Sequence, residues 1–167
     1  MRGVAPMSKT APVRPTVSVL VSSYNYAAFV VEAIESVLAQ TENALEIIIV
    51  DDGSKDDTLA IARAIDDPRV RVFAQPFNMG KGAALRRAFQ EATCEYVVVQ
   101  DADLEYDPRD FSALLQPLLD GKADAVFGSR FTGHSRRVRT HAVAARRRAC
   151  PFTRKDRRGG PGFRNHT

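Results

Sequence analysis

Short apolar runs alternate along the chain with segments in which apolar residues recur every three or four positions. The apolar runs predict five strands, at residues 16–22, 46–50, 70–74, 96–100 and 123–127. The periodic segments predict helices at residues 26–40, 56–66 and 81–92, and a fourth from an N-cap at Asp107 to a C-cap at Gly121. This alternation favours an α/β fold with a doubly wound, mainly parallel sheet.

Polar clusters follow four of the five predicted strands. They occupy residues 22–25, 51–54, 101–103 and 128–130, and the loop after the third strand adds Asn78 and Lys81. The C-terminal ends of parallel strands meet at one edge of a sheet, and open α/β sheets bind their ligands there. We therefore expect these residues to form one site.

Asp101 and Asp103 follow an apolar strand and are separated by one residue. Two carboxylates in a crevice are costly to keep charged unless a cation lies between them. Mg²⁺ or Mn²⁺ is the expected cation, because such ions prefer oxygen ligands and bridge carboxylates to substrate phosphates. An acidic loop that caps the next helix is the alternative interpretation.

Cationic and aromatic residues at the same edge favour a nucleoside diphosphate. Lys81 lies between two glycines at a predicted helix start, where backbone N–H groups and the helix dipole also attract an anion. The planar guanidinium of Arg130 suits phosphate. Tyr24 is a candidate to stack on a base, and Asp52 is a candidate to accept a hydrogen bond from a base or ribose. Packing of Tyr24 and helix capping by Asp52 are the alternatives.

Charge is distributed unevenly, which suggests a boundary near Gly133. Residues 134–167 carry ten arginines, one lysine and one aspartate, a net charge of +10, whereas the preceding residues have a net charge of −6. We expect a flexible leader at 1–15, a ligand-binding domain at 16–133 and a basic, disordered tail at 134–167.

The change in composition after about Val138 suggests the frameshifted end of a longer gene. A genuine basic tail that binds anionic lipid headgroups or nucleic acid is the alternative. Cys94 and Cys150 lack metal-ligand spacing, which favours a reducing compartment. Without a signal-peptide pattern or an apolar run of about 18 residues, a cytoplasmic protein is expected, with peripheral contact to the cytoplasmic membrane face as an option.

Six motifs in order carry a resemblance to a known family. Three of them resemble the opening of the family 2 glycosyltransferases, which have the GT-A fold; these are SSYNYA, ESVLAQT and EIIIVDDGSKDDT. The polyprenyl-phosphate (dolichol-phosphate) sugar synthase branch resembles more narrowly NMGKGAALR, VVQDADLEYDP and AVFGSRF. The resemblance covers about residues 16–133 and implies a GT-A fold that is incomplete at the C-terminus, because members of the family continue well beyond GSRF.

The resemblance implies metal-dependent, inverting transfer of a sugar from a UDP- or GDP-linked donor to an acceptor such as polyprenyl phosphate or a cell-envelope glycan. It places the base on Tyr24 and Asp52, the ribose or sugar on Asp101, and the metal on Asp103, with Asp101 as a second ligand. The implied catalytic residues are Asp101, Asp103 and Arg130, and the implied substrate-binding residues are Ser22, Tyr24, Asn25, Asp52, Asn78, Lys81 and Glu105.

Three other functions compete with this interpretation. An inactive nucleotide-binding fragment would keep the nucleotide site and lack the acceptor half. A basic-tailed nucleic-acid binder is disfavoured by the acidic body and by the lack of an aromatic-basic pattern, so no specific nucleic acid partner is expected. A phospho-acceptor receiver domain would need an Asp after the third strand, where the chain has Gln75, Pro76 and Phe77.

Overall fold

The computed structural model describes residues 17–40, 44–102, 108–128 and 143–147. Its elements in chain order are β1 (Val17–Ser23), α1 (Val30–Leu38), β2 (Ala44–Asp51), α2 (Thr58–Arg63), β3 (Val70–Ala74), α3 (Lys81–Glu91), β4 (Tyr96–Asp101), the 3₁₀ helix η1 (Pro108–Asp110), α4 (Phe111–Leu119), β5 (Ala125–Phe127) and β6 (Val143–Arg146).

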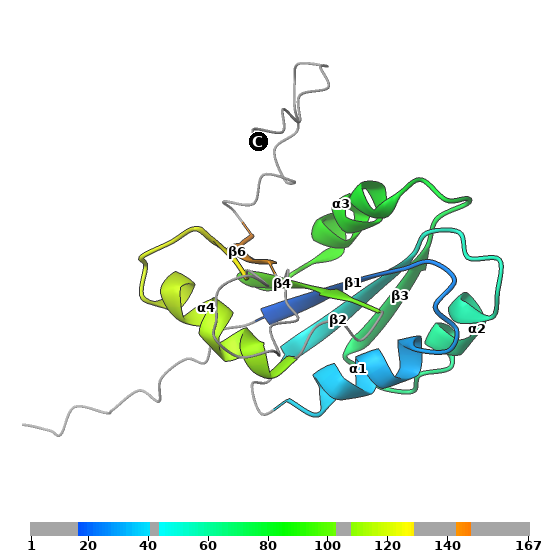
Figure 1. Ribbon diagram of the computed structural model, residues 1–167, viewed down its shortest axis with the longest axis horizontal. Coiled ribbons are helices and arrows are strands. Elements are labelled where there is room, and N and C mark those ends of the chain that lie inside the picture. Colours follow the sequence, from blue (N-terminus) through cyan, green and yellow to red (C-terminus); the bar gives the residue numbers. More distant parts are fainter. Residues whose placement is uncertain (1–16, 41–43, 103–107, 129–142, 148–167) are drawn as a thin grey trace, which may run out of the picture.

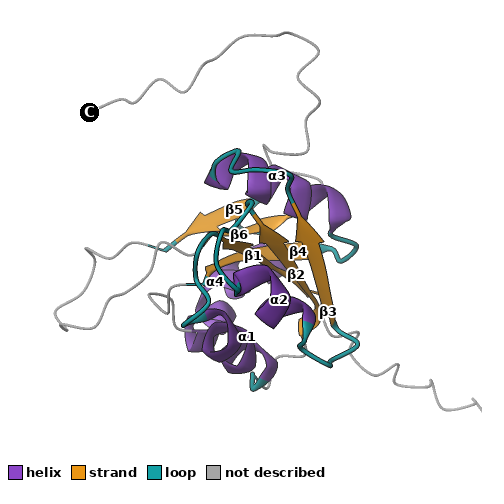
Figure 2. Ribbon diagram, turned by 90° about the vertical axis from the view of Figure 1, so that its right-hand side faces the viewer, coloured by secondary structure: helices purple, strands orange, loops and turns teal. Residues whose placement is uncertain are grey.

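The six strands form one sheet in the order β3-β2-β1-β4-β6-β5. The pairs among β1, β2, β3 and β4 are parallel, whereas β6 runs antiparallel to both of its neighbours, β4 and β5. Helices α1, α2 and α4 lie on one face of the sheet and α3 on the other (Figures 1 and 2). The predicted doubly wound, mainly parallel α/β sheet is confirmed.

The central strands are buried on both faces, and each contains apolar residues that point to both sides of the sheet. In β1, Val19 and Val21 contact the cluster under α1, α2 and α4, while Leu20 joins the cluster under α3. Leu20 is in register with Ile48 of β2 and Val99 of β4, so one apolar layer crosses the three strands. This core fixes the C-terminal ends of β1, β2 and β4 at one edge.

The sixth strand corrects the prediction that residues 134–167 are disordered. Val143–Arg146 inserts between β4 and β5, with Ala144 and Ala145 buried on opposite faces of the sheet. The small side chain of Ala144 packs in the cluster under α1, α2 and α4, and that of Ala145 packs in the cluster under α3. Apart from Arg147, the remaining residues of the predicted tail, and the predicted leader, lie outside the described residues.

Helix boundaries follow local hydrogen bonds more than apolar periodicity. The first helix begins at Val30 rather than at residue 26, and the Tyr26 N–H donates to Thr58 Oγ1 at 2.8 Å. The predicted C-cap at Gly121 is confirmed: its φ is 70°, and the N–H groups of Gly121 and Lys122 donate to the carbonyls of Leu118 and Pro117. Asp107, the predicted N-cap of this helix, lies outside the described residues.

Within the described part of the chain, no helix combines the length and the apolar character that a membrane span requires.

Candidate functional site

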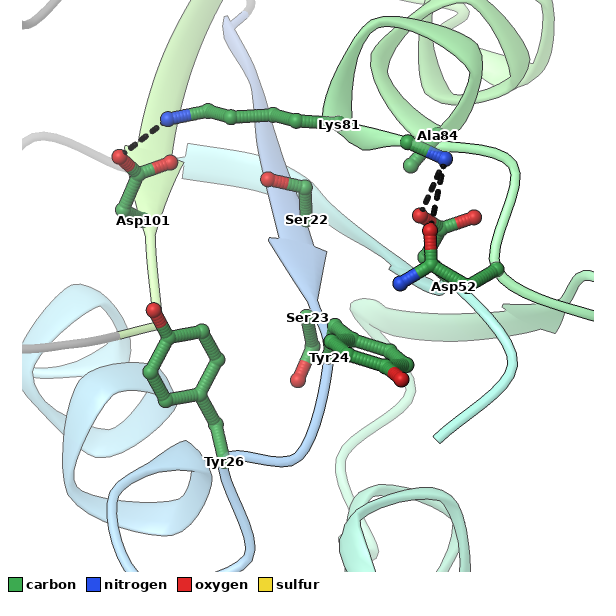
Figure 3. Close-up of a pocket in the computed structure, with 10 residues that line it drawn as sticks. Ser22, Ser23, Tyr24, Tyr26, Asp52, Lys81, Ala84 and Asp101 are labelled. Carbon is green, nitrogen blue, oxygen red and sulfur yellow. Dashed lines mark hydrogen bonds and ion pairs between the residues drawn. The ribbon is translucent and has the colours of Figure 1, made fainter. Parts of the chain in front are cut away.

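A pocket of about 250 Å³ opens at the C-terminal edge of the sheet (Figure 3). Its walls come from the loop after β1, the end of β2, the loop before α3, the first turn of α3 and the last residue of β4. The lining residues are Ser22, Ser23, Tyr24, Tyr26, Asp52, Asn78, Gly80, Lys81, Ala84 and Asp101.

Hydrogen bonds join the loops after β1 and β2 into one wall. Asn25, in the left-handed region with φ of 57°, accepts from the Lys55 N–H through Oδ1 at 2.9 Å and donates its own N–H to Ser54 Oγ at 2.9 Å. Ser54 in turn donates its N–H to Asp51 Oδ2 at 2.9 Å. Asn25 is exposed and does not line the pocket, so its observed contacts serve the loops around it.

Asp52 holds the loop before α3 against the end of β2. Its Oδ1 accepts from the Met79 N–H at 2.8 Å and from Gln75 Nε2 at 2.9 Å, and its Oδ2 accepts from the Gly80 N–H at 2.7 Å. Asp52 is 3% exposed. Its carboxylate therefore positions a wall of the pocket instead of capping α2, and a contact to a base or ribose stays a prediction.

Gly53 permits this close approach of the two loops. Its φ is +74°, and a Cβ at this position would lie 2.5 Å from the carbonyl carbon of Phe77 and 2.7 Å from the Asn78 nitrogen. Because backbone atoms cannot yield as the end of a side chain can, only glycine fits here.

Lys81 and Asp101 join opposite walls of the pocket. Lys81 is the first residue of α3, Asp101 is the last residue of β4, and Lys81 Nζ lies 2.5 Å from Asp101 Oδ2 (Figure 3). The Lys81 side chain is 56% exposed, whereas that of Asp101 is 11% exposed. The predicted phosphate-binding cation and the predicted metal-binding carboxylate thus contact each other.

The second oxygen of Asp101 has the properties of a ligand atom. Oδ1 is buried and has no hydrogen-bond partner among the described residues, and the same holds for Ser23 Oγ in this pocket. A buried carboxylate oxygen without a partner is costly unless a cation or donor satisfies it. The described residues contain no group of three or more metal-binding side chains. Mg²⁺, however, needs only one or two carboxylates together with substrate phosphates, so Asp101 fits such an ion.

The structure brings together six of the predicted site residues. Those lining the pocket are Ser22, Tyr24, Asp52, Asn78, Lys81 and Asp101. Three further predicted residues, Asp103, Glu105 and Arg130, lie outside the described residues.

Two pocket residues, Tyr26 and Ala84, were not singled out from the sequence. The sequence could have indicated Tyr26 as a site residue, because it stands in the same SSYNYA motif as Tyr24. Ala84 lies one helical turn after Lys81, and its small side chain gave no signal of its own.

The family described as "Glycosyl transferase family 2" matches residues 18–165. The chain belongs to this family. The match extends over most of the segment expected to be a disordered tail, in agreement with the strand β6 found there.

Curated relatives of this family 2 chain are longer proteins. The succinoglycan biosynthesis protein ExoO of Rhizobium meliloti is 43% identical over 89 residues, which is 53% of this chain and 26% of that protein. The dolichol-phosphate mannosyltransferase of Pyrococcus furiosus is 33% identical over 121 residues, which is 69% of this chain and 33% of that protein. The chain thus spans about a quarter to a third of these two relatives.

Solved structures of similar fold include complexes with nucleotides. A mannosyltransferase from Pyrobaculum calidifontis in complex with GDP-Man and Mn²⁺ has a TM-score of 0.68 at 26% identity, covering 82% of this chain and 46% of that chain. Glucosyl-3-phosphoglycerate synthase from Mycobacterium tuberculosis, in complex with Mn²⁺, UDP and glucosyl-3-phosphoglycerate, has a TM-score of 0.63 at 25% identity, covering 80% and 57%. The chain has the GT-A fold.

Proposed function

We propose that this protein is a glycosyltransferase that takes a sugar from a UDP- or GDP-linked donor in the presence of Mg²⁺ or Mn²⁺. The observation that carries the proposal is the pocket itself. It combines a buried oxygen of Asp101 that has no partner among the described residues, an ammonium from Lys81 and the half-buried Tyr24. These three groups suit a metal, a diphosphate and a base, respectively. Two similar structures hold a nucleotide with Mn²⁺, which supports the same chemistry here.

Roles can be assigned within this proposal. Asp101 and Asp103 hold the metal, which compensates charge on the leaving diphosphate when bound. Lys81 and Arg130 bind the phosphate oxygens, where negative charge develops as the glycosidic bond breaks. Tyr24 stacks on the base, and Asp52 keeps the Gln75–Gly80 loop in place beside it. Ser22, Asn78 and Glu105 complete the proposed donor site, and Asn25 supports it from outside the pocket by joining the loops after β1 and β2.

We further propose inversion at the anomeric carbon and an acceptor that is either a polyprenyl phosphate or a cell-envelope glycan. The dolichol-phosphate mannosyltransferase relative supports the first acceptor, and the succinoglycan biosynthesis relative supports the second. A lipid phosphate is already anionic, so it attacks without a strong general base. Location at the cytoplasmic membrane face stays a prediction.

Calorimetric titration of the full chain with UDP and GDP, each with and without Mn²⁺, tests the donor site. We expect one nucleotide to bind in a metal-dependent manner, and Asp101→Ala to lose that binding. Incubation with the matching sugar nucleotide and polyprenyl phosphate should then release nucleoside diphosphate. Binding without release on any acceptor would favour the alternative of an inactive nucleotide-binding protein, and no binding by folded protein would contradict both.

A further inference from the structure

In the ion pair between Lys81 and Asp101, each residue occupies a position that a ligand of the other would take. The ammonium lies where a metal ion would bind Asp101, and the carboxylate lies where a phosphate would bind Lys81. Lys81 Nζ lies 2.5 Å from Asp101 Oδ2, where a divalent cation would otherwise approach the carboxylate. In this geometry, Asp101 cannot offer both oxygens to a metal, and the charge of the Lys81 ammonium is already balanced in part by Asp101 before a phosphate arrives.

We propose that Lys81 is an internal counter-ion that occupies Oδ2 of Asp101, and thereby weakens divalent-cation binding to this carboxylate, until the diphosphate of the donor draws the ammonium away. The inference rests on the proposed function, because it concerns the metal and diphosphate of the same site. It predicts that metal and nucleotide bind cooperatively, and that part of this cooperativity depends on Lys81.

Burial makes the pair worth forming when no ligand is bound. Asp101 is the last residue of a strand that is buried throughout, and its side chain is 11% exposed. An ionised carboxylate in such a place is costly without a positive partner. Lys81 supplies that partner from a flexible stem that is 56% exposed, so the ammonium can leave without disturbing the core.

The position of Lys81 argues against a purely structural pair. Lys81 is the first residue of α3, where the positive end of the helix dipole disfavours a cation. A lysine at this position does not stabilise the helix, but together with the positive end of the helix dipole it attracts an anion. A diphosphate in the pocket would therefore compete with Asp101 for the ammonium.

The Lys122–Asp120 pair provides an internal control. Lys122 Nζ lies 2.8 Å from Asp120 Oδ2, and the two residues are neighbours in the turn after α4. Neither lines the pocket. Substitution of Lys122 removes one lysine charge, as substitution of Lys81 does, and leaves the site intact.

The experiment measures Mn²⁺ binding to the full chain by electron paramagnetic resonance of the free ion, without nucleotide and then with saturating UDP or GDP. The variants are Lys81→Met, which keeps the length of the side chain and removes its charge, Lys81→Arg, which keeps the charge, and Lys122→Met as control. We expect Lys81→Met to bind Mn²⁺ on the order of 10-fold more tightly than wild type without nucleotide. Lys81→Arg and Lys122→Met should stay near wild type.

Nucleotide should raise the Mn²⁺ affinity of Lys81→Met by a smaller factor than that of wild type, because the counter-ion is already gone. Equal or weaker nucleotide-free Mn²⁺ binding by Lys81→Met, in protein whose circular dichroism matches wild type, would overturn the inference. A wild-type protein that binds neither UDP nor GDP with Mn²⁺ would overturn the proposed function instead, while the nucleotide-free comparison still decides the role of Lys81.

Discussion

Two buried carboxylates lie at opposite ends of the same sheet and have contrasting partners. Glu46, near the start of β2, is 7% exposed and accepts from Ser18 Oγ at 2.7 Å, from the Thr93 N–H at 2.5 Å and from Arg71 Nη1 at 3.2 Å. Asp101, at the end of β4, has one ammonium partner and one buried oxygen without a partner in the described residues.

Ionisation of Glu46 is supported by its surroundings. Burial raises the pKa of the Glu46 carboxyl, but hydrogen bonds from Ser18, Thr93 and Arg71 outweigh burial, so the pKa lies below its usual value. The saturated carboxylate ties β1, β2, β3 and the residues before β4 together, which is a structural role. Asp101, one oxygen of which has no partner among the described residues, lies in the pocket, where a ligand can contact it. The two carboxylates therefore differ more in the number of their hydrogen-bond partners than in the depth of their burial.

The largest expected effect is on ligand binding by Asp101→Asn. We expect metal-dependent nucleotide binding and sugar transfer to fall by roughly 100-fold or more, as for loss of one group that stabilises developing charge. The free energy of unfolding should change little, because the substitution removes a buried charge, one oxygen of which has no partner among the described residues. Calorimetric titration and urea denaturation measure the two quantities, and a large loss of stability would contradict the contrast with Glu46.

Glu46→Gln should show the reverse pattern. The amide would turn an NH₂ group toward the donors that now contact the carboxylate, at a cost of about 2–3 kcal/mol in the free energy of unfolding. Nucleotide affinity per folded molecule should stay at the wild-type value. Urea denaturation followed by circular dichroism measures the change, and loss of nucleotide affinity in the folded variant would break the comparison.

Gly53→Ala and Gly121→Ala form a matched pair at the two ends of the sheet. Both glycines have positive φ, but only a Cβ on Gly53 would meet backbone atoms. Gly121→Ala should cost about 1–2 kcal/mol from the left-handed conformation alone, without effect on nucleotide binding. Gly53→Ala should cost more and weaken nucleotide binding, since the Phe77 and Asn78 backbone must move. Thermal unfolding and nucleotide titration of both variants test this, and equal effects would contradict it.

The smallest expected effect is the pH dependence of stability contributed by Glu46. Because its folded pKa is below the usual value of 4.5, its contribution is present above that pH and is lost as the pH falls through the folded pKa. The difference in unfolding free energy between wild type and Glu46→Gln should therefore shrink from pH 7 to below pH 4. A difference that stays constant over this pH range would show that ionisation of Glu46 does not contribute to the free energy of unfolding.

Apolar runs predicted five of the six strands, but they did not indicate the order of the strands in the sheet. The run Ile47–Val50 and its counterpart in β4 are β-branched and buried on both faces, so their sequence alone specified them. Val143–Arg146 was missed because it contains one β-branched residue, two alanines and an arginine, and is surrounded by further arginines. Its strand conformation depends on β4 and β5 beside it, which no local pattern shows.

The candidate site was predictable as a set of residues but not as a set of contacts. Strand ends indicated that Asp52, Lys81 and Asp101 would meet at one edge, and they do. The sequence could not show that Lys81 would pair with Asp101. Nor could it show that Asp52 would be engaged by backbone N–H groups of Met79 and Gly80, because every residue but proline carries such a donor.

The insertion of β6 between β4 and β5 has a consequence for folding during synthesis. β5 is paired only with β6 in the described sheet, and the other edge of β4 is closed only by β6. A nascent chain that has left the ribosome as far as Phe127 therefore has β1 to β4 available for pairing, while β5 still lacks its neighbour. Until Val143–Arg146 emerges, the backbone of β4 from Tyr96 to Val99 is an open template for a strand of another polypeptide. Slow translation between these two points would lengthen that exposure, and a chaperone that covers strand edges would be needed most at this stage.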